Sequence, residues 1–331
     1  MTPTTGHSVI SNAVFRAERQ RIIDATEANI ARTNLYHNVY RLDIPNITYM
    51  DVWYTRDDDD PLYVSIMDEP GTLSGNILRL LVDLPSLQTH SKIEGNTIRP
   101  IPYRSPPECG CDTQDIRHHG KIRALPVVAF DETIHFAKIS KYKSEVANLL
   151  KVKDTGGSPR VIELLGRTQD GRLVFPRHET GFNASRIAKP LTIALLKRWA
   201  VQLAEAVCFL HSIGIIHRDL HVRNVLVTKD KQNMILCDLE CRWGSDDAPE
   251  ICPDDWDYER PYTEKSDVYC FGKMLNDVIM GAEPKNPWVS WSAPAPFSSI
   301  VETCKAEDPD DRPTMQEAKA MLEAILVHDD E

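Results

Sequence analysis

The stretch that decides the fold prediction is HRDLHVRN, residues 217–224. Six of its eight side chains are charged groups, imidazoles or an amide, and such groups are costly to bury without partners. This density of polar groups indicates a functional loop rather than a piece of hydrophobic core. Asp219 and Asn224 offer a carboxylate and an amide oxygen, which are the hard donors that Mg²⁺ prefers. The stretch therefore suggests a loop that takes part in phosphate transfer.

Three other segments offer the remaining groups that phosphoryl transfer requires. The reaction depends on positioning and on neutralisation of charge more than on covalent help from the protein. IHFAKIS places Lys138 on a predicted strand, SEVANLL places Glu145 at the start of a predicted helix, and MILCDLE brings a predicted strand to Asp238. Taken singly, each residue has an ordinary explanation as a solvated or capping side chain. If all of these ordinary explanations held, the order and spacing of the three segments would match the needs of phosphoryl transfer only by accident.

The loop HRDLHVRN resembles the catalytic loop H-R-D-x-x-x-x-N of protein kinases, with its spacing intact. IHFAKIS is similar to that family's V-A-I-K strand, and MILCDLE falls where the family has D-F-G. The resemblance implies that Asp219 orients the acceptor hydroxyl and that Asn224 and Asp238 hold Mg²⁺ or Mn²⁺. It further implies that Lys138, positioned by Glu145, contacts the phosphates of ATP.

Further matches extend the resemblance to about residues 115–327. Residues 248–250 match A-P-E, and the resemblance pairs Glu250 with Arg312 of DPDDRPT in a partly buried ion pair. The segment SDVYCFG looks like the family's buried helix, whose aspartate, here Asp267, braces the catalytic loop. These matches imply an α+β fold of two lobes, a small antiparallel β-rich lobe and a larger helical lobe, behind a mixed α/β N-terminal extension.

The remaining residues of the loop combine features of two branches of kinases. His217 and Arg218 complete the H-R-D pattern, and the resemblance gives them structural roles. His221 makes the loop similar to the D-x-H-x-x-N of aminoglycoside and choline kinases, whereas Arg223 resembles the arginine that tyrosine kinases place before the asparagine. Either His221 or Arg223 is expected to offset charge on the moving phosphoryl group.

The glycine-rich loop that would cover the phosphates is degenerate. Counted back from Lys138, it falls at DIRHHGKI, which keeps only Gly120 of three expected glycines, while Ile122 matches the apolar residue that follows. Glycines let backbone N–H groups approach phosphates closely, so their loss predicts modest nucleotide affinity.

The adenine ring is expected to lie against VFPRH, residues 174–178. Pro176 has no N–H, but its carbonyl can accept a hydrogen bond from adenine. The backbone N–H of His178 can donate one.

Two departures bear on the reaction and its acceptor. Glu240 stands where D-F-G has glycine, and it adds a carboxylate beside the metal ligands. Only eleven residues separate Asp238 from Glu250, which leaves little room for a platform that binds a peptide. Three classes of function therefore stay open. The motifs of the helical lobe favour a protein kinase. The sequences DLH and DLE and the short segment between Asp238 and Glu250 favour a small-molecule kinase. The degenerate glycine-rich loop favours a pseudokinase, which would act as a binding or scaffold module.

The rest of the chain is organised around this domain. Residues 1–107 form the predicted extension, with a helix over 12–36, a hairpin of two strands at 46–55 and 62–69, and a Pro-rich linker at 100–107. Residues 108–331 form the kinase-like domain, divided into a small lobe with hinge, 108–179, and a helical lobe, 180–331. The small lobe is predicted to contain strands at 121–130, 133–140, 160–168 and 171–178, and a helix at 144–152.

Composition excludes several other classes. The net charge of −11 over 331 residues disfavours a nucleic-acid binder, which would show a basic face. No run of about 18 uncharged apolar residues predicts a membrane span, and the N-terminus shows no pattern of a secretory signal. The eight cysteines lack metal-ligand spacing, so we expect reduced thiols in an intracellular, cytoplasmic protein. The expected partners are ATP and a hydroxyl acceptor, either a protein or a small molecule.

Overall fold

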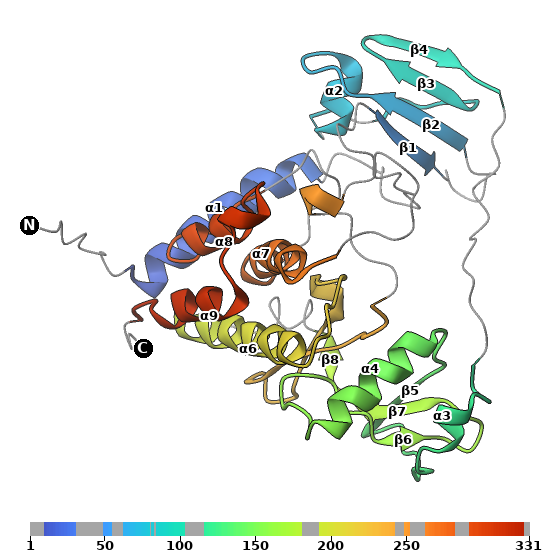
Figure 1. The fold of residues 1–331 in the computed structure, drawn as a ribbon. Coiled ribbons are helices and arrows are strands. Elements are labelled where there is room, and N and C mark those ends of the chain that lie inside the picture. Colours follow the sequence, from blue (N-terminus) through green and yellow to red (C-terminus); the bar gives the residue numbers. More distant parts are fainter. Residues whose placement is uncertain are drawn as a thin grey trace, which may run out of the picture.

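The structure is a computed structural model that describes residues 10–30, 49–54, 62–79, 81–82, 84–102, 116–180, 192–241, 248–251, 262–281 and 291–327. Its described elements form a small lobe, a helical lobe and a separate N-terminal sheet (Figure 1). The two lobes share one hydrophobic core, whereas the N-terminal sheet has a core of its own.

The small lobe is a three-stranded antiparallel sheet in the order β5-β7-β6, with helix α4 packed beside it. Its elements are β5 (His135–Lys138), α4 (Lys143–Asp154), β6 (Gly166–Arg167) and β7 (Leu173–Pro176). Leu173 and Val174 are fully buried in β7, the strand that lies between β5 and β6. In α4, Val146, Leu149 and Val152 recur at helical spacing and face the core.

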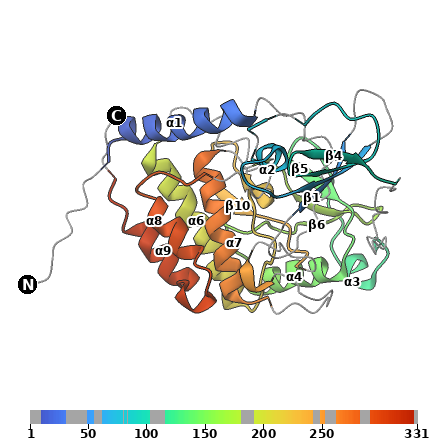
Figure 2. The same ribbon diagram turned by 90° about the horizontal axis from the view of Figure 1, so that it is seen from above.

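The helical lobe contains four described α-helices and a short three-stranded sheet in the order β10-β9-β8. The helices are α6 (Ile193–Ser212), α7 (Glu264–Met280), α8 (Ser298–Cys304) and α9 (Met315–Glu323). The strands are β8 (Glu179–Thr180), β9 (Val225–Val227) and β10 (Met234–Leu236), and the 3₁₀ turns are η1 (Val222–Asn224), η2 (Pro249–Ile251) and η3 (Pro309–Asp311). Figure 2 shows α6, α7, α8 and α9 grouped on one side of the molecule.

Local sequence explains where these helices begin. Thr192 accepts a hydrogen bond from the Leu195 N–H at the start of α6, and Thr263 forms a reciprocal capping box with Ser266 at the start of α7. The core between the helices is built from large apolar side chains, among which Trp199 and Phe271 are fully buried.

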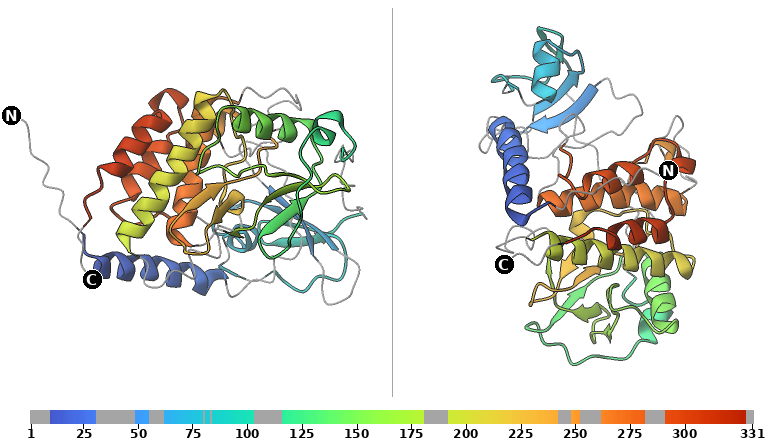
Figure 3. Two further views of the ribbon diagram at one scale, coloured as in Figure 1. Left: turned by 90° about the horizontal axis from the view of Figure 1, so that it is seen from below. Right: turned by 90° about the vertical axis from the view of Figure 1, so that its left-hand side faces the viewer.

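The N-terminal helix α1 (Asn12–Ile30) belongs to the helical lobe by its contacts (Figures 2 and 3). Phe15 is 1 % exposed and meets Phe297 edge to face, with ring centroids 6.0 Å apart. The Arg19 guanidinium donates to the carbonyls of Ile279 and Met280 at the end of α7, at 2.7 and 2.6 Å. Carbonyls at a helix C-terminus lack partners within the helix, so Arg19 caps α7.

The N-terminal sheet has the order β1-β2-β3-β4, with α2 in the connection between the parallel strands β2 and β3. Its elements are β1 (Tyr49–Tyr54), β2 (Leu62–Met67), α2 (Leu73–Leu78), β3 (Ser91–Glu94) and β4 (Thr97–Pro100). The antiparallel pairing of β1 with β2 confirms the predicted hairpin, whose tip lies outside the described residues.

The predicted division at residue 107 remains a prediction, and the structure adds two facts to it. Phe15 belongs to the core of the lobes, whereas β1–β4 have their own core, so the first 107 residues contribute to both clusters. The predicted helix over 12–36 is described as far as Ile30, and most of the predicted linker lies outside the described residues.

One predicted strand is wrong. Residues 121–130 contain the short helix α3 (Gly120–Arg123) and then only a single bridge, from Val127 to Arg167. Ile122 and Leu125 are three positions apart and both are buried, which suits a helical turn better than an alternating strand. Pro126 then ends the turn, because a proline disfavours helical geometry in the residue before it.

Two further expectations concern the whole chain. The cysteines that the structure describes, at positions 208, 237, 241, 270 and 304, are free thiols. Within the described part of the chain, no helix is both long enough and apolar enough to cross a membrane.

Candidate active site

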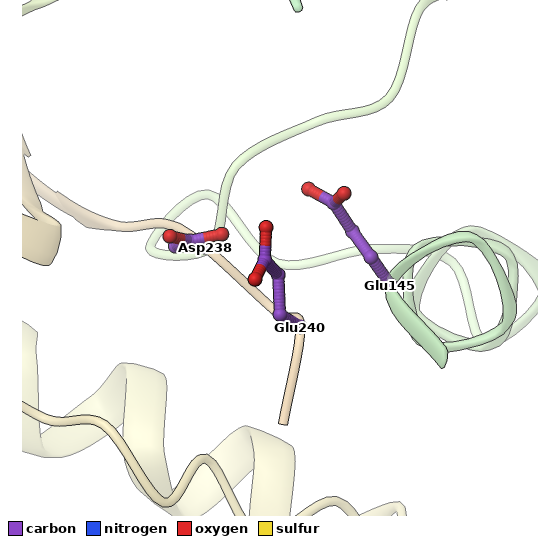
Figure 4. A group of neighbouring side chains, drawn as sticks. All are labelled: Glu145, Asp238 and Glu240. Carbon is purple, nitrogen blue, oxygen red and sulfur yellow. The ribbon is translucent and has the colours of Figure 1, made fainter. Parts of the chain in front are cut away.

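Lys138 lies at the centre of a cluster of three carboxylates. Its Nζ is 2.7 Å from Glu145 Oε1, 3.0 Å from Asp238 Oδ1 and 3.5 Å from Glu240 Oε1. Figure 4 shows Glu145 reaching from α4 toward Asp238 and Glu240, which follow β10. The structure thus brings together Lys138 and Asp238, which lie 100 positions apart in the sequence.

The charges of this cluster shift its protonation equilibria. Burial alone would lower the pKa of Lys138, but the nearby charges of Glu145 and Asp238 outweigh burial and hold that pKa above its ordinary value. Lys138 therefore stays a cation. Burial, and then the charge of Asp238, raise the pKa of the Glu240 carboxyl.

Glu145 is the fixed member of the cluster. Its side chain is 2 % exposed, and Ser140 Oγ donates to Glu145 Oε2 at 2.7 Å. Helix α4 is also tied to the segment after β10, because Asn148 Nδ2 donates to the Leu239 carbonyl at 2.9 Å. Sequence reasoning missed Ser140 and Asn148; their only signal was their proximity to Lys138 and Glu145.

Asp267, at the start of α7, braces the loop that carries Asp219. Its two carboxylate oxygens accept hydrogen bonds from the backbone N–H groups of His217 and Arg218, both at 2.8 Å. His211 Nε2 is a third partner, 2.9 Å from Asp267 Oδ2, and it was not expected from the sequence. Since Asp267 is fully buried, three partners on one carboxylate hold the loop firmly to the helical lobe.

The next contacts fix the path of the loop. His217 donates from Nε2 to the Cys237 carbonyl at 3.0 Å, and its Nδ1 accepts from the Asp219 N–H at 3.3 Å. Arg218 has φ of 71°, in the left-handed region that non-glycine residues rarely adopt. Its guanidinium carbon lies 5.1 Å from the centre of the Tyr262 ring, and this cation–π contact supports the loop.

Asp219 is held by two neighbours within the same loop. His221 Nε2 and Asn224 Nδ2 lie 3.1 and 2.9 Å from Asp219 Oδ2. Because His221 Nδ1 accepts from the Arg223 N–H at 3.2 Å, the ring proton sits on Nε2 and is donated to Asp219. Burial would raise the pKa of Asp219, but the hydrogen bonds from His221 and Asn224 help to outweigh burial and lower that pKa. Asp219 is therefore an oriented, ionised carboxylate.

The metal ligands that the resemblance implies are hard oxygen donors. Asp238 follows β10 with φ of 64°, and Asn224 donates through its Nδ2, which leaves its Oδ1 as the acceptor end of the amide. Glu145, Asp238 and Glu240 each offer an oxygen, and these oxygens lie within 4.8 Å of one another. This donor set fits Mg²⁺ or Mn²⁺, which take carboxylate and carbonyl oxygens.

Glu250 and Arg312 meet in a bidentate pair, although they lie 62 positions apart. Both Nη–Oε distances are 2.7 Å, and the Arg312 side chain is fully buried. Arg312 also donates to the carbonyls of Ala306, Lys265 and Glu307 and lies over the Tyr269 ring. The pair therefore joins η2 to the start of α7 and to η3.

The residues expected to contact the nucleotide are brought together less completely than those around Lys138 and Asp219. Pro176 ends β7, and His178 follows it, half-buried, with a pKa lowered by burial. Two residues expected to contact the nucleotide lie elsewhere: Gly120 is exposed at the start of α3, and Ile122 is fully buried in the core. The expected role of Ile122 is therefore wrong, because an apolar residue at a helical position packs inward, and Gly120 opens a helix instead of turning between two strands.

Comparison with known proteins agrees with this geometry. Residues 138–293 match the family described as protein tyrosine and serine/threonine kinase. A probable serine/threonine-protein kinase of Dictyostelium discoideum is 28 % identical over 247 residues, which cover 60 % of this chain and 14 % of that protein. A probable LIM domain-containing serine/threonine-protein kinase of the same organism is 30 % identical over 41 % of this chain and 25 % of its own length.

Human mitogen-activated protein kinase kinase kinase 7 is 25 % identical over 51 % of this chain and 33 % of its own length. The chain thus spans a third or less of each of these three relatives. The matched residues contain the Lys138 cluster, the Asp219 loop and the helix that braces that loop. Residues 138–293 are therefore similar to the protein tyrosine and serine/threonine kinase family, and the described residues form a small β-rich lobe and a larger helical lobe.

Proposed function

We propose that this chain transfers the γ-phosphate of ATP to a hydroxyl group, and that the acceptor is a protein. The observation that carries the proposal is the meeting of Lys138, from the small lobe, with Asp238, from the helical lobe, at 3.0 Å. A cation for phosphates and a carboxylate for a metal ion are the two charges that phosphoryl transfer must place side by side.

Each residue then has a separate role. Asp219, held by His221 and Asn224, accepts a hydrogen bond from the acceptor hydroxyl and orients its oxygen toward the phosphate. Asn224 and Asp238 hold Mg²⁺ or Mn²⁺, with Glu240 as an additional carboxylate within reach. When bound, the ion neutralises charge on the phosphate oxygens.

Charge on the side of the nucleotide is offset by cations. Glu145 keeps Lys138 in place, so that its ammonium can contact the phosphates without reorganisation during the reaction. Arg223 is exposed beside the loop, where its guanidinium can meet charge that develops on the moving phosphoryl group.

A protein acceptor is supported by the names of the relatives, which are serine/threonine-protein kinases. A second candidate is a small-molecule kinase. It is favoured by the contact of His221 with Asp219 and by the eleven residues between Asp238 and Glu250. A pseudokinase is favoured only by the degenerate glycine-rich loop, and the charged set around Lys138 and Asp219 argues against it.

The test is transfer of labelled γ-phosphate by the full chain with Mg²⁺ or Mn²⁺. Three acceptor pools are compared: unfractionated cell protein, synthetic peptides, and a mixture of small metabolites that bear hydroxyl groups. Asp219→Asn is the matched control for contaminating activity. Label in protein or peptide supports the proposal, and label confined to metabolites supports the second candidate. No transfer above that of Asp219→Asn, despite bound MgATP, would identify a pseudokinase.

A further inference from the structure

Phe136 is an exposed aromatic residue on the strand that carries Lys138. It lies two positions before Lys138 on β5, and side chains two apart on a strand point to the same face. Lys138 reaches Asp238 from that face, so Phe136 points toward the candidate active site as well. Phe136 is 48 % exposed, on an outer strand of the sheet order β5-β7-β6.

This residue is also a departure from the V-A-I-K strand that the segment resembles. That pattern has alanine two positions before the lysine, where this chain has Phe136. A benzyl group in place of a methyl group adds a large flat surface to the face of β5 that carries Lys138. The family's pattern alone therefore does not say what this surface does.

The neighbours of Phe136 place it between the two ends of a nucleotide. On β7 it pairs with Phe175, which is 4 % exposed and precedes the segment proposed to meet the base, Pro176–His178. On β5 it precedes the lysine proposed to meet the phosphates. A nucleotide that reaches from Lys138 to His178 must pass beneath Phe136.

Phe130, the other exposed aromatic ring among the described residues of the small lobe, does not share this position. Phe130 lies outside β5; its ring is 6.1 Å from His135, on the opposite face of the strand, and Arg172 lies 5.7 Å above it. Phe136 has no ring or cation contact of this kind with the described residues. A flat, apolar partner could stack on the exposed ring of Phe136.

We propose that the base of the bound nucleotide stacks on Phe136, and that stacking supplies most of the recognition of the base. This inference rests on the proposed function. Stacking is tolerant of base identity, because every base has a π-face. Recognition of the base edge by this segment is limited to the Pro176 carbonyl and the His178 N–H, because Pro176 has no N–H to offer. We therefore expect the site to bind MgATP and MgGTP with dissociation constants within about tenfold of each other.

The experiment is calorimetric titration of the full chain with MgATP, MgGTP and magnesium tripolyphosphate, which has the phosphates but no base. Phe136→Ala removes the ring, Phe136→Tyr restores it, and Phe130→Ala is a matched loss of an exposed ring elsewhere in the lobe. We expect Phe136→Ala to weaken MgATP binding roughly 5- to 150-fold, the range for loss of one aromatic stacking contact. Tripolyphosphate binding should not change, and Phe136→Tyr and Phe130→Ala should bind MgATP like the wild type.

The outcomes separate this inference from the proposed function. If the wild type binds neither nucleotide, the proposed function fails, and the inference fails with it. Three results would overturn the inference alone: Phe136→Ala binds MgATP as well as or better than the wild type, it weakens tripolyphosphate equally, or the wild type prefers ATP to GTP by more than about 100-fold. Thermal unfolding without ligand checks the fold, and Phe136→Leu provides a second variant that lacks the ring if Phe136→Ala is unstable.

Discussion

The two lobes of this protein hold their functional residues in different ways. In the helical lobe, Asp267 and His217 are fully buried and form a network that fixes the loop of Asp219 from several directions. In the small lobe, Lys138 lies on β5 of a three-stranded sheet. Large apolar side chains of this lobe, such as Phe136 and Ile134, remain about half exposed.

This difference suggests that the two lobes have different roles. A buried, fully paired network keeps its geometry without a ligand, whereas an open sheet gains much of its local order from the ligand itself. We therefore expect changes in the helical lobe, apart from the proposed metal ligands Asn224 and Asp238, to affect turnover and stability, and changes in the small lobe to affect nucleotide affinity.

Asp219→Asn should produce the largest effect. The substitution keeps the shape of the side chain but removes the charge that orients the acceptor hydroxyl, so we expect turnover to fall by about 10²- to 10⁴-fold. The dissociation constant for MgATP should stay nearly unchanged, because Asp219 acts in the transition state rather than on the bound nucleotide. Steady-state rates and calorimetry measure the two quantities. The exposed Asp230, in the turn after β9, provides the control Asp230→Asn. A loss of affinity as large as the loss of turnover would contradict the separation.

Arg312→Met should cause the largest loss of stability. It leaves Glu250 and three backbone carbonyls without their donor, and removing one partner of a buried ion pair costs about 3–5 kcal/mol. Denaturant unfolding measures the change. Arg172→Met is the control, because Arg172 pairs with Asp170 at the surface and its loss should hardly move the midpoint.

A double-mutant cycle with Glu250→Gln sharpens the same prediction. Once Arg312 has been replaced, loss of the Glu250 charge should cost less than it does in the wild type, since the two residues are in contact. Additive effects would mean that the pair does not hold η2 to η3 in solution.

Lys138→Met should weaken MgATP binding in the small lobe. Loss of a charge-assisted hydrogen bond costs about 1.5–3 kcal/mol, which corresponds to roughly 10- to 150-fold in the dissociation constant. Calorimetry measures the change, and Lys141→Met, which removes an exposed lysine nearby, serves as the control. Because Lys138 also balances the buried Glu145, thermal unfolding must show that the variant remains folded. An unchanged affinity would mean that Lys138 does not contact the nucleotide.

The smallest expected effect is the dependence of the Glu250–Arg312 pair on pH. Burial would raise the pKa of Glu250, but the hydrogen bond from Arg312 outweighs it and holds that pKa below the ordinary value of 4.5. The folded state then binds the proton less readily than the unfolded state does. The contribution of Glu250 to stability is complete above about pH 4.5 and is lost as the pH falls through the lower, folded value. The difference in unfolding free energy between the wild type and Glu250→Gln should therefore shrink between pH 5 and pH 3. A constant difference would show that the pair does not shift this pKa.

The sequence predicted the helical lobe better than the small lobe, for a physical reason. Asp219, Asn224 and Asp267 lie in segments whose order and spacing are set by the reaction and by the loop that supports it. Asn224 contacts Asp219, and Asp267 holds the backbone of their loop, because buried polar groups must pair. The meeting of Glu250 and Arg312 across 62 positions was expected from the resemblance of residues 248–250 and DPDDRPT to kinase motifs, and the structure shows this contact.

The small lobe was harder to predict because its pattern is ambiguous. GKIRAL contains apolar residues at a spacing that suits one helical turn, yet it lies where a strand was expected. Partners of buried groups were also missed, since Ser140, Asn148 and His211 carry no motif of their own. Their positions follow from packing between segments, which a single sequence does not reveal.

The most direct test of the account is calorimetric titration of the full chain with ATP, in the presence of Mg²⁺ and again in the presence of EDTA. The account predicts binding that requires the metal, that weakens in Lys138→Met and Asp238→Asn, and that persists in Asp219→Asn. Binding that is absent in the wild type, or that is equally strong without the metal and in all three variants, would contradict the claim that these residues form a site for metal-bound ATP.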